Sequence, residues 1–171
     1  IRPADIVETA EAWDVALKTN GPTVLALSRQ GLKAYRSEKT NKNLVSHGGY
    51  ILNNISKDRD ITLIATGSEI EIAMEATEIM YKDGIKATVV SLPCWELFDK
   101  QDKEYKNQVL GNCPRIAIEA ASEMGWSKYI GEKGIFIGMK SFGASGPASD
   151  LYNHFNITSK SIIDTAKLLL K

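Results

Sequence analysis

Residues 61–92, ITLIATGSEIEIAMEATEIMYKDGIKATVVSL, decide the fold, because almost every position in them can be assigned to a structural element. Residues 61–65 and 87–92 are short runs of β-branched and apolar residues, which is typical of strands buried on both faces. Between them, residues 69–82 repeat their inward-facing side chains at helical spacing: Ile70, Ala73, Met74, Thr77 and Met80. A helix of this length returns the chain to its starting edge, so the sequence predicts two parallel strands with a helical crossover.

The turn at residues 66–69, TGSE, allows two interpretations. Ser68 with Glu71 predicts a capping box, and acidic residues are favoured at the positive end of a helix dipole. A strand end followed by a helix N-terminus also suits an anion or phosphate. The turn lacks repeated glycines and a P-loop lysine, and Glu69 would repel phosphate, so we favour the cap.

Composition excludes several classes of protein. The chain has 171 residues, 43% hydrophobic and 25% charged, as expected for a globular protein with one domain and part of another. Basic and acidic residues balance at 21 each, which argues against a nucleic-acid partner, and no apolar run is long enough for a membrane span. The start of the chain, IRPAD, has neither an initiator methionine nor a signal peptide, so we expect a fragment of a longer protein. Two widely separated cysteines, Cys94 and Cys113, favour a reduced, cytoplasmic protein over a zinc site or disulfide framework.

Residues 1–45 are predicted to belong to a neighbouring structural unit. Residues 5–18 have the pattern of a helix capped by Asp5 and Glu8, followed by a stop at residues 20–22 and a buried strand at residues 23–27. The apolar residues that repeat at helical spacing in residues 5–18 are Ile6, Val7, Ala10, Trp13, Ala16 and Leu17. In residues 31–46 the apolar residues do not repeat with a regular period, which indicates a linker and a domain boundary near residue 45. The basic residues around it have little aromatic interleaving and fit a solvated linker better than a nucleic-acid patch: Lys33, Arg36, Lys39, Lys42, Lys57 and Arg59.

Residues 46–171 are predicted to form the second unit. An edge strand is expected within residues 47–52, a polar turn at 53–60, and two further strands at 115–120 and 134–138. Residues 94–98 are expected to form an apolar-rich loop or a helical turn. Helical segments are expected at residues 101–110, 126–130, around Leu151 and Phe155, and after the N-cap Thr158.

Arg29 is the most interesting candidate for chemistry. It lies just past the carboxyl end of the strand predicted at residues 23–27, where open α/β sheets gather ligands, and a guanidinium group can bind a phosphate at two points. An exposed arginine is also often only solvated.

The other titratable residues favour structural roles. His47 and His154 have no nucleophile or carboxylate partner nearby in sequence, and we interpret them as surface or packing residues. Glu119 and Glu123 could pair as acid and base, but caps or salt bridges are the favoured interpretation. The aromatic residues Trp95, Phe98, Trp126 and Phe142 are expected to be core or interface anchors.

Several short motifs occur in the order and spacing of one known enzyme family. They are RPAD at residues 2–5, ALSRQ at 26–30, GGY at 48–50, ATGSE at 65–69, VSLP at 90–93, FDKQ at 98–101 and FGAS at 142–145. Together they cover nearly the whole chain, which thereby resembles the carboxyl-terminal part of transketolase. The resemblance implies that residues 1–45 are the tail of the pyrimidine-binding domain plus a linker. Residues 46–171 would then be the C-terminal domain, a three-layer α/β/α fold with a mostly parallel sheet.

The resemblance also implies an activity. Transketolases are homodimers of the pentose phosphate pathway that use thiamin diphosphate and Mg or Ca to move a two-carbon ketol unit from a ketose phosphate to an aldose phosphate. By resemblance, Arg29 holds the sugar phosphate. The family's diphosphate and metal ligands, its catalytic glutamate and its substrate histidines belong to segments upstream of Ile1, so we expect this chain alone to bind no cofactor and to be inactive. The stretches Cys94-Trp95 and EAASEMGW, residues 119–126, depart from the family pattern.

Two alternatives are retained. The chain could be the C-terminal part of another thiamin diphosphate enzyme, against which the LSRQ and FDKQ segments argue. It could also be a regulatory or assembly module that binds an anion at residues 66–69.

Overall fold

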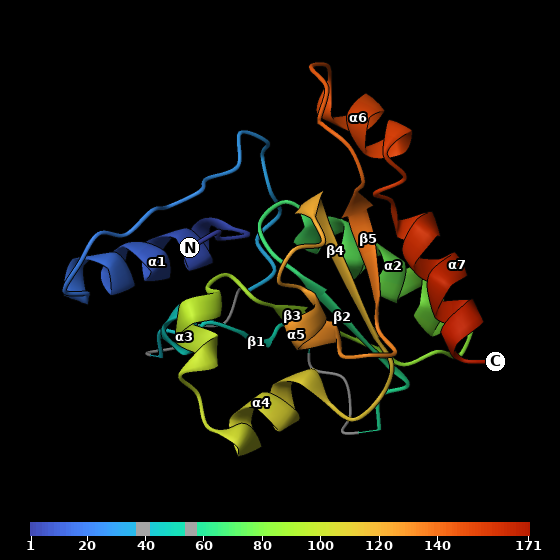
Figure 1. Ribbon diagram of the computed structural model, residues 1–171, viewed down its shortest axis with the longest axis horizontal. Helices are drawn as coiled ribbons and strands as arrows, with labels where there is room; N and C mark the ends of the chain where they lie inside the picture. The colour runs from blue at the N-terminus through green and yellow to red at the C-terminus, as the bar shows by residue number, and fades with distance from the viewer. Residues whose placement is uncertain (37–41, 54–57) are drawn as a thin grey trace.

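The protein contains one five-stranded, mostly parallel sheet between layers of helices, as the computed structural model shows (Figure 1). The structure describes residues 1–36, 42–53 and 58–171. The strands are β1 (Tyr50–Ile51), β2 (Ile61–Ala65), β3 (Ala87–Ser91), β4 (Arg115–Ser122) and β5 (Ile135–Met139). Their order in the sheet is β1-β3-β2-β4-β5, and only the edge strand β1 is antiparallel to its neighbour.

The two faces of the sheet are covered by different helices. One layer contains α2 (Glu69–Lys82) and α7 (Ser159–Leu169), which pack against each other and over β2, β3, β4 and β5. The opposite layer contains α3 (Trp95–Asp99), α4 (Lys103–Leu110) and α5 (Ser127–Ile130), whose core includes the buried Phe98 and Trp126. The three-layer α/β/α architecture predicted from the sequence is therefore confirmed.

The central unit forms as the sequence predicts. β2 and β3 are buried at every position and pair in parallel from Ile61 opposite Ala87 to Ala65 opposite Ser91. Helix α2 spans the predicted residues 69–82 and buries Ile70, Ala73 and Met80. Thr158 caps α7 by accepting a hydrogen bond from the Ser161 N–H at 3.2 Å.

The prediction for residues 23–27 is wrong. These residues are extended, but they form no strand of the described sheet, and Val24 and Leu27 are exposed. Among the described residues their backbone pairs with Ile1, whose amino group donates to the Val24 carbonyl at 2.7 Å and whose carbonyl accepts from the Ala26 N–H at 2.9 Å. A strand needs neighbouring strands for its backbone groups, and here none lies beside this segment.

Helix α1 (Ile6–Lys18) forms as predicted, with its apolar stripe facing away from the rest of the described chain. Asp5 caps it as expected, but Ile6, Trp13 and Leu17 on the apolar stripe are largely exposed. The buried side carries Glu8 and Ala12 instead. The polar contacts of α1 with the rest of the chain, described below, account for this orientation.

The remaining elements are η1 (Val45–His47) and α6 (Ala148–His154). Residues 37–41 of the predicted linker and residues 54–57 of the predicted turn lie outside the described residues. On either side of residues 37–41, Tyr35, Arg36 and Leu44 contact α1, so the predicted solvated linker is packed at both ends. None of the described helices has the length and apolar character needed to cross a membrane.

Candidate functional site

The order of the strands creates a crevice at the carboxyl ends of β2 and β4. The chain proceeds from β2 to β3 on one side and returns to place β4 on the other side. In open α/β sheets, ligands bind at such a switch point. Here the side chain of Arg2 enters it and contacts residues that follow both strands.

Five other residues surround the Arg2 guanidinium group, and we call the set the Arg2 cluster: Arg2, Thr66, Ser68, Glu69, Glu119 and Tyr152. Nη1 donates to the carbonyl and hydroxyl oxygens of Thr66, both at 2.8 Å, and forms ion pairs with Glu69 and Glu119. Nη2 donates to the Ser68 hydroxyl at 3.1 Å. Tyr152, from α6, donates to Glu69 at 2.5 Å. Four distant parts of the chain therefore meet at one arginine.

The two carboxylates of the cluster are buried and close to each other. Burial, followed by the neighbouring charge of Glu69, raises the pKa of Glu119 to about 8, although Arg2 and the Thr66 hydroxyl oppose the shift. Burial disfavours the charge of Arg2, but Glu119 and Glu69 outweigh this effect and raise its pKa. We conclude that at neutral pH Glu119 holds a proton while Arg2 is charged, because burial and a second carboxyl group nearby disfavour the charge of Glu119.

This arrangement bears on both interpretations of residues 66–69: Ser68 lies at the predicted N-cap position of α2, but the predicted capping hydrogen bond is wrong. Ser68 makes no capping hydrogen bond to the backbone of α2, because its hydroxyl contacts Arg2, Glu69 and Tyr152 instead. The turn is also filled: a Cβ atom at Gly67, which has φ of 51°, would lie 2.7 Å from Cζ of Arg2. A guanidinium group is therefore already packed against this turn, and the two carboxyl groups beside it disfavour a phosphate there.

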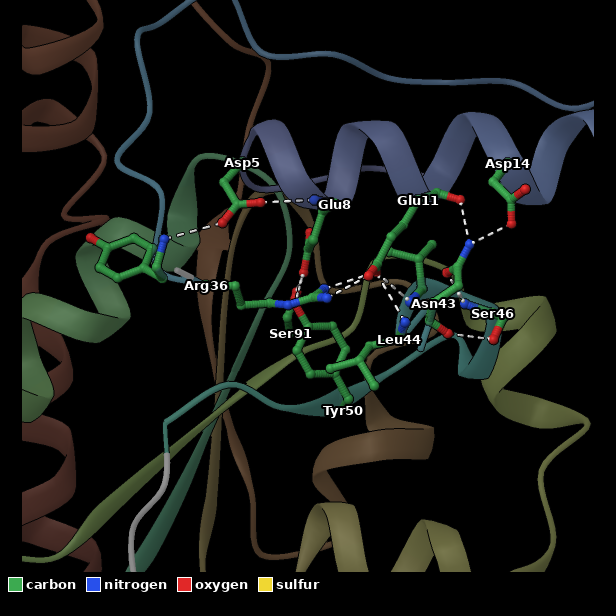
Figure 2. Close-up of polar contacts among 12 residues, drawn as sticks. Asp5, Glu8, Glu11, Asp14, Arg36, Asn43, Leu44, Ser46, Tyr50 and Ser91 are labelled. Carbon is green, nitrogen blue, oxygen red and sulfur yellow. Dashed lines mark hydrogen bonds and ion pairs between the residues drawn. The ribbon is translucent and has the colours of Figure 1, made fainter. Parts of the chain in front are cut away.

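A second buried network joins α1 to the sheet (Figure 2). The Glu8 carboxylate accepts hydrogen bonds from the Tyr50 hydroxyl at 2.7 Å, the Ser91 hydroxyl at 2.5 Å and the Ala4 N–H at 2.6 Å. Burial raises the pKa of Glu8, while these three donors lower it. Glu8 thus links the first helix to β1 and β3.

Glu11 extends the contact one turn further along α1. It forms an ion pair with Arg36 and accepts from the Leu44 and Val45 N–H groups at 3.0 and 3.1 Å, as Figure 2 shows in part. The Arg36 and Glu11 side chains are 9% and 12% exposed, so this pair is shielded from water. These contacts of Glu11 join α1 to residues 36, 44 and 45 of the same unit, while Glu8 makes the buried contacts to Tyr50 and Ser91 of the second unit.

The other candidates stay apart from these networks. Arg29 is exposed, and in the described parts of the chain it has no hydrogen-bond or ion-pair partner. Because the residues before it form no sheet strand, its predicted position at a strand end is wrong, although it follows the segment that pairs with Ile1. His47 stacks on Tyr105 at 5.2 Å and His154 contacts Phe155 at 4.8 Å between ring centroids, in agreement with packing roles.

Glu119 and Glu123 do not form a pair, since Glu119 is buried in the Arg2 cluster and Glu123 is exposed. Trp95, Phe98 and Trp126 pack together or around Tyr129, as predicted, whereas Phe142 is 98% exposed. Sequence reasoning gave no role to Arg2 or Tyr152. The sequence did contain one signal for this cluster. Glu69 and Glu119 follow or end neighbouring buried strands, and two carboxyl groups so close to the core need a cation beside them.

The described residues do not fit a thiamin diphosphate or metal site. They contain no group of three or more His, Cys, Asp or Glu side chains that could hold a metal ion. The crevice that would suit a diphosphate contains Arg2 and two carboxylates. No chemical step through such a group can be assigned to this chain.

These features define a three-layer α/β domain with the Arg2 cluster at the carboxyl ends of β2 and β4. Residues 48–158 match the family model of the transketolase-like C-terminal domain. The chain belongs to the transketolase family. It is 52% identical to a transketolase of Sinorhizobium medicae and 50% identical to one of Cereibacter sphaeroides, over 99% and 98% of its length. In both cases it spans 25% of the relative, that is, about a quarter of the length of the curated proteins it matches.

Solved structures agree with this assignment. The chain superposes on the transketolase from Leishmania mexicana with a TM-score of 0.90 and 38% identity, over 99% of this chain and 25% of that one.

Proposed function

We propose that the protein carrying this chain is a transketolase that transfers a two-carbon ketol unit from a ketose phosphate to an aldose phosphate. Thiamin diphosphate and a divalent metal, Mg or Ca, would supply the carbanion chemistry and would be held by residues outside this chain. The observation that carries the proposal is the match to relatives named transketolase over 99% of the chain at 52% identity.

Within that enzyme, Arg29 is proposed to bind the substrate phosphate. An exposed guanidinium group without a partner among the described residues is free to form a bidentate, charge-assisted contact with an anion. The backbone pairing between Ile1 and residues 24 and 26 holds the segment just before it. Residue Ile1 is in turn fixed by its neighbour Arg2.

Residues 1–45 are proposed to be the tail of the pyrimidine-binding domain and residues 46–171 the C-terminal domain. The exposed Ile6, Trp13, Leu17 and Val24 support this division, because apolar side chains of this size are normally covered by the rest of a domain. We further propose a homodimer located in the cytoplasm. The two cysteines are free thiols, which suits a reducing compartment.

Substitution of Arg29 in the full-length enzyme tests the proposed contact. We expect Arg29→Ala to raise KM for phosphorylated sugars by roughly 10- to 100-fold, the equivalent of losing a charge-assisted hydrogen bond of about 2 kcal/mol. Arg29→Lys should recover part of the loss. The KM for an unphosphorylated acceptor aldehyde should stay unchanged, since it offers no phosphate to the arginine.

An equal effect on phosphorylated and unphosphorylated acceptors would reject the role of Arg29. The assignment of activity is tested separately, by ketol transfer in the unsubstituted full-length protein supplied with thiamin diphosphate and Mg. The 171-residue chain alone is expected to give no ketol transfer. Measurable activity from it would contradict the proposal that residues outside this chain hold the cofactor.

A further inference from the structure

A pocket lies at the amino ends of the parallel strands, on the opposite edge of the sheet from the Arg2 cluster. Its volume is about 780 Å³, within the range of small-molecule sites. The polar residues that line it include Arg59, Thr88, Asn107, Gln108, Asn112 and Cys113. Nothing in the proposed ketol transfer uses these residues.

The hydroxyl of Thr88 indicates that the pocket takes a ligand. Thr88 is 1% exposed, and its Oγ1 atom has no hydrogen-bond partner among the described residues. Buried hydroxyl groups are nearly always paired, because an unpaired one loses its water without compensation. A polar molecule in this pocket would provide the missing partner.

Cys113 is the reactive group of the pocket. It is half-buried, and its sulfur lies 3.3 Å from Oγ1 of Thr62. The Thr62 hydroxyl donates its proton to the Leu110 carbonyl at 2.9 Å, so the oxygen is left to accept from the thiol. This contact orients the sulfur without blocking it.

Arg59 lines the same pocket as Cys113, Arg115 follows Cys113 by two residues, and neither arginine forms an ion pair in the described part of the chain. Arg59 donates to the Val109 and Gln108 carbonyls at 2.8 and 2.5 Å, and Arg115 donates to the carbonyls of Tyr129 and Gly111. Burial lowers the pKa of both arginines. Partial exposure next to unpaired guanidinium groups is the environment in which protein thiols react.

Cys94 offers an internal comparison. It is only 7% exposed, and its sulfur is 3.5 Å from the carboxylate of Glu96. Burial, with a contribution from Glu96, raises the pKa of the Cys94 thiol. The two cysteines therefore differ in access and in the sign of the neighbouring charge.

We propose that Cys113 is a thiol modification site that exchanges with small disulfides bearing carboxylate groups, of the glutathione class. The Cys113 sulfur attacks one sulfur of the disulfide RSSR, the S–S bond breaks, and a new S–S bond joins Cys113 to one half. The other half leaves as a thiolate and takes up the proton that Cys113 released, so RSH is the second product.

The lining of the pocket suits such a group. Arg59 can face a carboxylate, and the side-chain amides of Asn107, Gln108 and Asn112 can pair with peptide groups. Thr88 then gains a hydrogen-bond partner. Asp58 and Glu104 also line the pocket, but both are exposed, where solvent and salt weaken their repulsion.

The test treats the native protein with oxidised glutathione, which is anionic, and in parallel with cystamine, which is cationic. Peptide mapping by mass spectrometry gives the rate of modification at each cysteine. The rate at which each disulfide reacts with a free cysteine derivative is measured as well, and it corrects for the different intrinsic reactivities of the two disulfides. We expect Cys113 to react at least about tenfold faster than Cys94, and to prefer oxidised glutathione over cystamine by roughly fivefold.

Two variants connect the preference to the pocket. Arg59→Gln should abolish the preference for the anionic disulfide, and the near-isosteric Thr88→Val should slow glutathionylation while circular dichroism shows an unchanged fold. Equal rates at Cys113 and Cys94, or a preference for cystamine, would overturn the proposal. So would a Thr88→Val variant that is folded and reacts at the original rate, since the pocket would then play no part.

Discussion

Replacement of Glu119 by glutamine tests the charge state that we assign to the Arg2 cluster. Glutamine has the shape of the protonated acid: its carbonyl oxygen can accept from Arg2, and its amide, in the place of the second oxygen of Glu119, can donate to the Thr66 hydroxyl or to Glu69. The ion pair between Arg2 and Glu69 is retained. We therefore expect Glu119→Gln to remove the titration without removing the contacts.

The magnitude follows from the pKa of Glu119, which rises from its ordinary value of 4.5 to about 8 in the folded protein. Between these two pH values the folded chain keeps a proton that the unfolded chain has released. The free energy of unfolding must then fall as pH rises through this window, by at most about 1.4 kcal/mol per pH unit. The wild-type protein should lose on the order of 4 kcal/mol across the window from this group, whereas the variant should not.

Thermal unfolding measured from pH 5 to pH 9 is the assay. For a chain of this size, 1 kcal/mol corresponds to roughly 2–4 °C in Tm, so the variant should be more thermostable than the wild type by about 10 °C near pH 8.5. The Tm values of the wild type and the variant should converge at pH 5. Glu123→Gln is the matched control, because it makes the same chemical change at an exposed position and should leave the pH profile parallel to wild type.

Parallel profiles for the wild type and Glu119→Gln would refute the reasoning, since Glu119 would then be ionised in the folded protein. A variant that is less stable at every pH would mean that the carboxylate, not the carboxylic acid, balances Arg2.

Two further predictions concern the contacts that hold the first and last helices. Glu8→Ala should lower the free energy of unfolding in urea by roughly 3 kcal/mol, because it leaves the buried Tyr50 and Ser91 hydroxyls without their acceptor, while Glu8→Gln, which keeps an acceptor oxygen, should cost less. A loss below 1 kcal/mol would show that these hydroxyls find other partners. Thr158→Ala should cost about 1 kcal/mol by removing the cap of α7, and Thr158→Ser should restore it; equal stability of both variants would exclude the cap.

The parts of the fold that could be predicted from sequence depend on neighbours in sequence. Residues 61–92 were assigned correctly because strand burial and helix periodicity are both local patterns, and α2 begins and ends at the predicted residues. Asp5 and Thr158 were identified as caps for the same reason, since each contacts a backbone group three residues later.

The parts that could not be predicted depend on distant or missing neighbours. Ser68 has the sequence signature of a capping residue, yet it contacts Arg2, 66 residues earlier, and Tyr152, 84 residues later. The pattern of residues 23–27 shows that they are apolar, but it cannot show whether strands lie beside them. Likewise, the apolar stripe of α1 marks a face that packs against something, while Glu8 and Glu11 decide which face packs against this chain.

The Arg2 cluster lies in the crevice where many α/β proteins bind a ligand, and in this sheet it makes structural contacts. The carboxyl ends of β2 and β4 would bind a small molecule in many α/β proteins, but here an arginine from the start of the chain occupies the position. Because Arg2 is fixed, Ile1 is fixed, and Ile1 in turn holds Val24 and Ala26 through its backbone. Arg29 follows three residues after this pairing. The same buried cluster that stabilises the C-terminal sheet is therefore connected, through one short backbone contact, to the residue that we propose binds the substrate phosphate.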